Sequence, residues 1–123
     1  MKYVIAALLA GHGVAHLVGF LVSWKLMEAP EMPFRTTILQ GAVDLADGGI
    51  RVYGVIWLML ALGFGASGVM LVAGLDVWQR LALALAAVSL VMCALGWPET
   101  RIGLIVNFGI LAFGLFRLAG YRT

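Results

Sequence analysis

The sequence predicts an all-α fold: an integral membrane four-helix bundle with a long first loop, forming one domain over residues 1–123. Hydrophobic residues make up 63% of the chain and charged residues 11%, which is too little charge to cover a soluble domain of this size. Four apolar segments reach or approach the roughly 20 residues that a helix needs to cross a bilayer. One long polar connection follows the first of them.

The four predicted spans cover residues 3–24, 52–75, 78–97 and 102–118. The first is longer than the apolar core of a signal peptide, about 7–15 residues, and no clear small-x-small cleavage site follows Trp24. We therefore expect a retained helix. Short connections after the second and third spans make the last three helices antiparallel neighbours.

The loop over residues 25–51 contains Pro30, Pro33 and the turn signal Asp47-Gly48-Gly49. Within it, residues 34–45 mix apolar and polar side chains. This pattern has two interpretations of equal weight. One is a short interfacial helix lying over the bundle, and the other is an irregular solvated loop.

Tryptophans and basic residues mark the ends of the spans. Trp24, Trp57 and Trp97 fall at the end that carries the long loop and Trp78 at the other, as in an interfacial aromatic belt. The basic residues divide equally, with Lys2, Arg80, Arg117 and Arg122 at one end and Lys25, Arg35, Arg51 and Arg101 at the other. Because the count is tied, the charged N-terminus and the basic tail decide our prediction that both termini are cytoplasmic.

Each span carries a stripe of small or polar residues on one helix face. The stripes are His12, His16, Gly19 and Ser23; Ala61, Gly65 and Gly68; Ala82, Ala86, Ser89, Cys93 and Gly96; and Gly103, Asn107, Ile110 and Gly114. Small residues at this spacing let helix backbones approach closely in a membrane. The stripes therefore predict the inward faces of a tight bundle.

Counting residues from the span ends places several polar side chains at similar depth. At a rise of 1.5 Å per residue, His16 and Ser89 both lie about 12 Å from the loop end, and Asn107 lies at about 9 Å. Cys93 is on the same face as Ser89, and His12 lies about 6 Å deeper than His16. We expect His16, Ser89, Cys93 and Asn107 to converge in a polar pocket beneath the long loop.

Ionisable side chains deep within a span are costly and raise a functional question by default. His16 is the candidate catalytic residue, because one histidine with a neighbour that holds its tautomer suffices for acid–base or quinone chemistry. The candidate ligand-binding residues are His12, His16, Ser89, Asn107, Glu99 and Arg101. In the structural alternative, both histidines make interhelical hydrogen bonds, Pro98 and Glu99 open the fourth helix, and Arg101 extends to the interface.

The histidine spacing also limits the cofactors. Residues four apart project from one side of a helix, so His12 and His16 cannot bind a single haem from opposite faces. The same spacing suits a metal ion, but nothing in the sequence brings Cys93 or a loop carboxylate to it, so no metal site is predicted. Haem and quinone remain unassigned candidates. The chain has no basic cluster, which excludes nucleic acid as a partner.

Three parts of the chain together resemble a known layout. They are His12-Gly13-x-x-His16-x-x-Gly19-Phe20, Ile56-Trp57-Leu58, and residues 97–107 with Arg101-x-Gly103 and Val106-Asn107. The chain resembles small bacterial four-helix membrane proteins of the DoxX-like type over nearly its whole length. The resemblance implies a subunit of the bacterial inner (cytoplasmic) membrane beside redox or respiratory partners. It assigns no catalytic residue.

Three functions follow from these patterns. The leading hypothesis is a non-catalytic accessory or assembly subunit that packs against larger membrane partners, of a respiratory or photosynthetic type, or against copies of itself. The alternative is a membrane-embedded enzyme or binding protein for a lipophilic molecule, a quinone or an isoprenoid, that uses His16. The third is a small dimeric exporter, which resembles four-helix multidrug transporters in size but lacks their glutamate in the first span.

Overall fold

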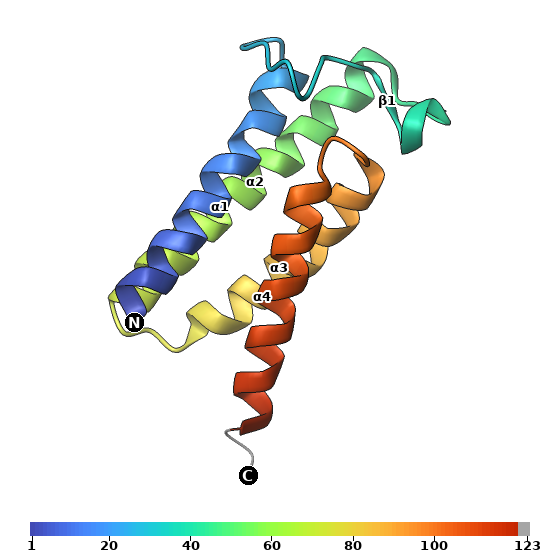
Figure 1. Cartoon of the computed structure of the whole chain (residues 1–123). Helices are drawn as coiled ribbons and strands as arrows, with labels where there is room; N and C mark the ends of the chain where they lie inside the picture. The colour runs from blue at the N-terminus through green and yellow to red at the C-terminus, as the bar shows by residue number, and fades with distance from the viewer. Residues whose placement is uncertain (121–123) are drawn as a thin grey trace.

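A computed structural model describes residues 1–120 and contains four long helices (Figure 1). These are α1 (Lys2–Ser23), α2 (Ala46–Val72), α3 (Val77–Leu95) and α4 (Arg101–Gly120). Each is long and apolar enough to cross a membrane, which confirms the predicted all-α class and the number of candidate spans. Arg122, which entered the orientation argument, lies outside the described residues.

Helix α2 begins six residues earlier than predicted, because Asp47-Gly48-Gly49 forms its first turn and not a bend in the loop. The Asp44 carboxylate accepts the Ala46 backbone N–H at 2.9 Å, which satisfies one of the donors left free at the start of the helix. Asp47, in the first turn, adds a negative charge at the positive end of the helix dipole.

Of the two interpretations of residues 34–45, the interfacial helix is wrong, and the loop instead contains a small hairpin. Strand β1 (Thr37–Ile38) pairs antiparallel with β2 (Val43–Asp44), with Ile38 opposite Val43. The tight turn Leu39–Gly41 joins the strands, and its three residues have positive φ values of 52°, 55° and 88°. Three successive left-handed residues cannot continue a right-handed helix, and β-branched residues on either side favour extended backbone.

Most members of the small-residue stripes are buried between helices, but on α2 the stripe is only partly right, because Gly65 has open space beside it and Trp57, Leu60 and Phe64 form the buried face. The most extensive packing is between α1 and α2, followed by α3 with α4 and α2 with α3. A Cβ atom on Gly13 would lie 2.7 Å from the Ala61 carbonyl oxygen, and one on Gly114 would lie 2.5 Å from Leu83 Cδ2. The backbones of α1 and α2 therefore approach as closely as glycine allows.

The elements are arranged with the hairpin at one end of the molecule (Figure 1). Helix α1 starts and α4 finishes at the opposite end, so the four helices run alternately up and down. Helices α1 and α4, the first and last, are not among the pairs that pack extensively. This incomplete closure between α1 and α4 positions the candidate site.

Candidate functional site

Polar side chains from α1, α3 and α4 meet in one hydrogen-bonded network inside the helices. His16 Nδ1 lies 2.8 Å from the His12 backbone carbonyl oxygen, and His16 Nε2 lies 2.5 Å from Ser89 Oγ. Asn107 Nδ2 donates to Ser89 Oγ at 2.7 Å and to Cys93 Sγ at 3.6 Å. Asn107 Oδ1 lies 2.9 Å from His12 Nε2, which returns the network to α1.

The network is almost entirely removed from the molecular surface. Ser89 and Asn107 are 0% exposed, His16 is 4% exposed and His12 is 8% exposed. Within residues 1–120, every fully buried side-chain nitrogen or oxygen has a hydrogen-bond partner. The polar groups therefore offset their own desolvation by bonding one another.

Helix α2 contributes only apolar and aromatic surface to this cluster. The rings of Phe64 and His12 meet edge-on with centroids 4.8 Å apart, and those of Trp57 and His16 with centroids 5.2 Å apart. Trp57 is 4% exposed. It was predicted to mark an interfacial belt with Trp24 and Trp97, and the structure instead buries it against His16. Gly19 permits this, because a Cβ there would lie 2.7 Å from the Trp57 ring.

A groove of about 570 Å³ between α1 and α4 reaches the histidines. Its walls include Gly11, His12, Ala15 and His16 from α1 and Gly103 and Val106 from α4. At the end nearest the long loop, it is lined by Glu31, Met32, Glu99 and Thr100. A second groove of about 500 Å³, with walls from α1, α3 and α4, shares Leu8 and Val106 with the first and is lined mainly by apolar residues. The two grooves therefore adjoin along the α1–α4 seam.

Depth counting predicts that His16, Ser89, Cys93 and Asn107 converge. In the structure these four side chains are joined by hydrogen bonds. His12, expected one turn deeper, belongs to the same network because Asn107 reaches across to it from α4. Sequence reasoning missed Trp57 and Phe64 as the apolar wall of the site. Both lie at helical spacing from Leu60 on α2, a pattern that marks a buried face and could have identified them.

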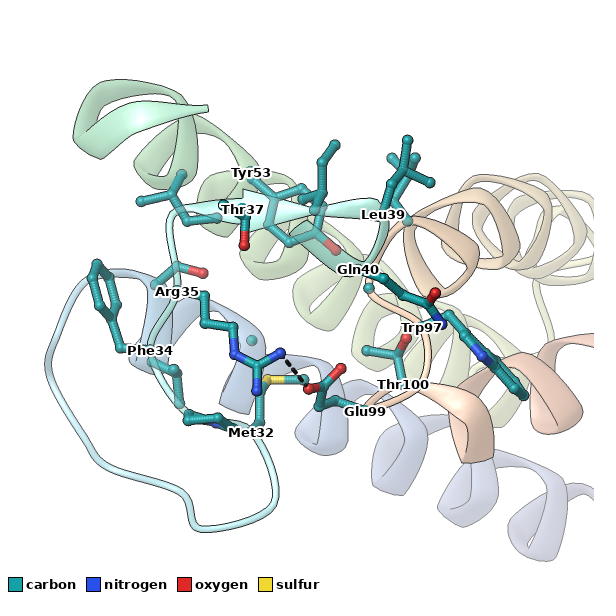
Figure 2. A pocket seen from close by; sticks show the side chains of 18 of the residues that line it. Met32, Phe34, Arg35, Thr37, Leu39, Gln40, Tyr53, Trp97, Glu99 and Thr100 are labelled. Atoms are coloured by element: carbon teal, nitrogen blue, oxygen red, sulfur yellow. Dashed lines mark ion pairs between the residues drawn. The ribbon is translucent and has the colours of Figure 1, made fainter. Parts of the chain in front are cut away.

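A separate, small cavity of about 80 Å³ lies beneath the hairpin (Figure 2). The Tyr53 hydroxyl donates to the Met92 carbonyl at 3.1 Å, and the Thr100 hydroxyl donates to the Cys93 carbonyl at 2.5 Å. This cavity and the α1–α4 groove adjoin, because they share the lining residues Gly19, Met32, Trp57, Glu99 and Thr100, but only the groove is lined by His12 and His16. The histidines therefore face the groove.

Glu99 and Arg101 have different surroundings. Glu99 borders both the cavity and the groove and forms an ion pair with Arg35 of the loop at 3.0 Å (Figure 2). Arg101 is exposed and lines neither space. The expectation that Pro98 and Glu99 open the fourth helix is wrong. They form the turn before it, in which the Arg101 N–H donates to the Pro98 carbonyl at 3.2 Å.

Within residues 1–120, no group of three or more His, Cys, Asp or Glu side chains is arranged to hold a metal ion. The chain matches no model of a known protein family, no characterised protein and no solved structure.

Proposed function

We propose that the protein is an integral membrane protein that binds a lipophilic molecule, of the quinone or isoprenoid class, in the α1–α4 groove. The observation that carries this proposal is the position of the buried polar network on the wall of a mainly apolar groove, whose other polar residues, Glu31, Glu99 and Thr100, lie at its loop end. Pockets for small molecules typically have volumes of about 300–1,000 Å³, apolar walls and a few convergent polar groups. The groove has all three properties.

Membrane insertion is supported by the outward faces of the helices. Large apolar side chains that are more than half exposed occur on all four, among them Leu8, Met59, Val91, Ile105 and Phe116. A soluble monomer seldom exposes so extensive an apolar surface. In a bilayer the α1–α4 groove would open sideways to the lipid, which gives a lipophilic molecule a direct path to the histidines.

The purely structural explanation of the network accounts for less of the geometry. Interhelical hydrogen bonds alone would be served equally well by side chains enclosed on every side. Here His12 and His16 both line open space, next to Gly11, where a Cβ would meet nothing within 4 Å. The small residues thus keep the imidazoles reachable from the groove.

The test is which lipophilic molecules co-purify with the protein. The chain is isolated in a mild detergent, and the bound lipophiles are identified by native mass spectrometry together with an absorption spectrum. The variant Val106→Trp fills the groove, because Val106 lines both of its parts. Val91→Trp is the matched control, because Val91 is 59% exposed on α3 and lines neither part. We expect Val106→Trp to lose a co-purifying molecule that Val91→Trp retains. Equal content in both variants would contradict the proposal.

A second candidate function is a non-catalytic accessory subunit packed against a larger membrane partner. The exposure of α4 favours it, because Asn107 and Gly114 are the only buried residues of this helix. A stoichiometric larger protein that remains bound to the chain in mild detergent supports this function. A monodisperse single chain argues against it.

A further inference from the structure

We propose that the ligand of the α1–α4 groove is a neutral lipid alcohol or phenol whose hydroxyl donates a hydrogen bond to Nδ1 of His12. This inference rests on the proposed function and specifies the chemistry of the molecule bound. It follows from which atom donates and which accepts in each hydrogen bond of the network. The His12 backbone carbonyl oxygen, which can only accept, determines these roles.

The donor and acceptor of each hydrogen bond can be assigned in turn, starting from the His12 backbone carbonyl. A carbonyl oxygen only accepts, so His16 Nδ1, 2.8 Å away, must carry the hydrogen. A neutral imidazole has one N–H, so His16 Nε2 is an acceptor. The Ser89 hydroxyl, 2.5 Å away, therefore donates to it.

The role of Ser89 as a donor to His16 determines which atom of the Asn107 amide faces it. The hydroxyl has a single proton, already used on His16, so Ser89 Oγ can only accept from its other neighbours, Cys93 Sγ at 4.0 Å and the nearer side-chain amide of Asn107. The amide atom that faces Ser89 must be the Asn107 nitrogen, at 2.7 Å. The reversed amide would set two acceptor oxygens, Asn107 Oδ1 and Ser89 Oγ, against each other without a proton between them. Asn107 Oδ1 is consequently directed towards His12.

The network fixes the tautomer of His12. Asn107 Oδ1 accepts, so His12 Nε2, 2.9 Å away, carries the hydrogen and His12 Nδ1 has a free lone pair. No residue among those described, 1–120, is hydrogen-bonded to His12 Nδ1. Since every fully buried side-chain nitrogen in that range has a partner, His12 Nδ1 must reach a surface, and His12 lines the groove. At the depth of the histidines the groove thus presents His12 Nδ1 as a hydrogen-bond acceptor, on a residue that is 8% exposed.

Because His12 Nδ1 is an acceptor, it favours a ligand that carries a hydrogen-bond donor. A quinone, ketone, ester or ether oxygen would bring a second lone pair to His12 Nδ1, whereas a hydroxyl supplies the missing hydrogen. Charged headgroups fit poorly, because His12 lies about 18 Å along α1 from Trp24 and charge at that depth in a bilayer is costly. Isoprenoid alcohols and quinols both satisfy these requirements.

The first measurement is ¹⁵N NMR of the histidine rings in the full chain reconstituted in lipid nanodiscs. The sequence has two histidines, so each tautomer can be assigned. We expect His16 protonated at Nδ1 and His12 protonated at Nε2. Geranylgeraniol should shift the His12 Nδ1 resonance and leave the same resonance unchanged in Val106→Trp. A His12 ring protonated at Nδ1 would overturn the proposal.

The second measurement compares matched ligands. Geranylgeraniol is paired with its methyl ether, and decylubiquinol with decylubiquinone. We expect the hydroxyl-bearing member to bind between roughly threefold and tenfold more tightly, the range expected for one net hydrogen bond. The pair that shows the difference identifies the ligand as an isoprenoid alcohol or a quinol. Equal binding within both pairs overturns the inference but leaves the proposed function intact, whereas no binding of any of the four probes overturns both.

Discussion

Ser89 joins three helices through one hydroxyl group, since it bonds His16 of α1 and Asn107 of α4 from its place on α3. Its contribution to stability therefore differs from that of an ordinary buried serine. Ser67 provides the comparison, because it is equally buried at 0% exposure but donates only to the Gly63 carbonyl of its own helix at 3.0 Å.

We predict that Ser89→Ala lowers the free energy of unfolding by about 1–3 kcal/mol, because it leaves His16 Nε2 and one Asn107 N–H unpaired within the helices. Ser67→Ala should cost less than about 1 kcal/mol, because the carbonyl that loses its second donor keeps its helical bond. Reversible unfolding in mixed micelles measures both. Equal losses would mean that Ser89 acts only by packing.

The sequence predicts much of the site at this scale and misses one part of it. Helical rise brought His16, Ser89 and Asn107 to similar depth, and helical spacing put Cys93 on the face of Ser89, since the spans are regular and nearly antiparallel. The burial of Trp57 was missed, because a tryptophan near a span end fits an interfacial belt, although its helical spacing from Leu60 and Phe64 also marks a buried face. What decides it is Gly19 on another helix, which leaves room for the indole ring.

At the scale of the helices, the α1–α2 interface depends on where glycine is required. Gly13 faces the backbone of α2, whereas Gly11, two residues away, faces the open groove. The same helix therefore offers a substitution that separates close packing from helix propensity.

We predict that Gly13→Ala destabilises the protein, because its Cβ would lie 2.7 Å from the Ala61 carbonyl oxygen and the two backbones must move apart. Gly11→Ala should be neutral or stabilising by up to about 1 kcal/mol, because its Cβ meets open space and alanine is the better helix former. Thermal unfolding in detergent compares the two variants. A Gly13→Ala protein as stable as Gly11→Ala would show that the helices are not in close contact.

The hairpin was beyond prediction from the sequence, because residues 34–45 carry too short a pattern to separate helix from strand. Its junction with α2 depends on Asp44. The pKa of this carboxyl is lowered, first by the Ala46 N–H and second by the Thr36 hydroxyl, which both favour the charged form. The bonds of this carboxylate are therefore complete above the ordinary aspartate pKa of about 4 and are lost as the pH falls through the lowered value.

We predict that carboxyl ¹³C NMR finds Asp44 titrating below the ordinary aspartate value, and that Thr36→Val raises its pKa by removing one donor. An unchanged Asp44 midpoint in the variant would exclude the side-chain bond.

For the molecule as a whole, the alternating direction of the helices places the connecting segments at two opposite ends. The hairpin and the α3–α4 turn lie at one end, joined by the Arg35–Glu99 ion pair, and the α2–α3 turn lies at the other (Figure 1). The tied count of basic residues leaves the orientation in the membrane to experiment. Cys93 is buried and is the only cysteine, so a Cys93→Ala background allows new cysteines to report position.

We predict that cysteines placed at the two ends are labelled from opposite sides of the membrane. Ala42→Cys lies in the hairpin and Ala73→Cys at the end of α2, and both residues are small and exposed. If the chain ends are cytoplasmic, a membrane-impermeant maleimide applied to intact cells labels Ala42→Cys, and Ala73→Cys is labelled only after permeabilisation. The reverse result would invert the orientation and retain the spanning fold. Labelling of both from one side would contradict membrane insertion, and with it the lateral path by which a lipophilic molecule reaches His12.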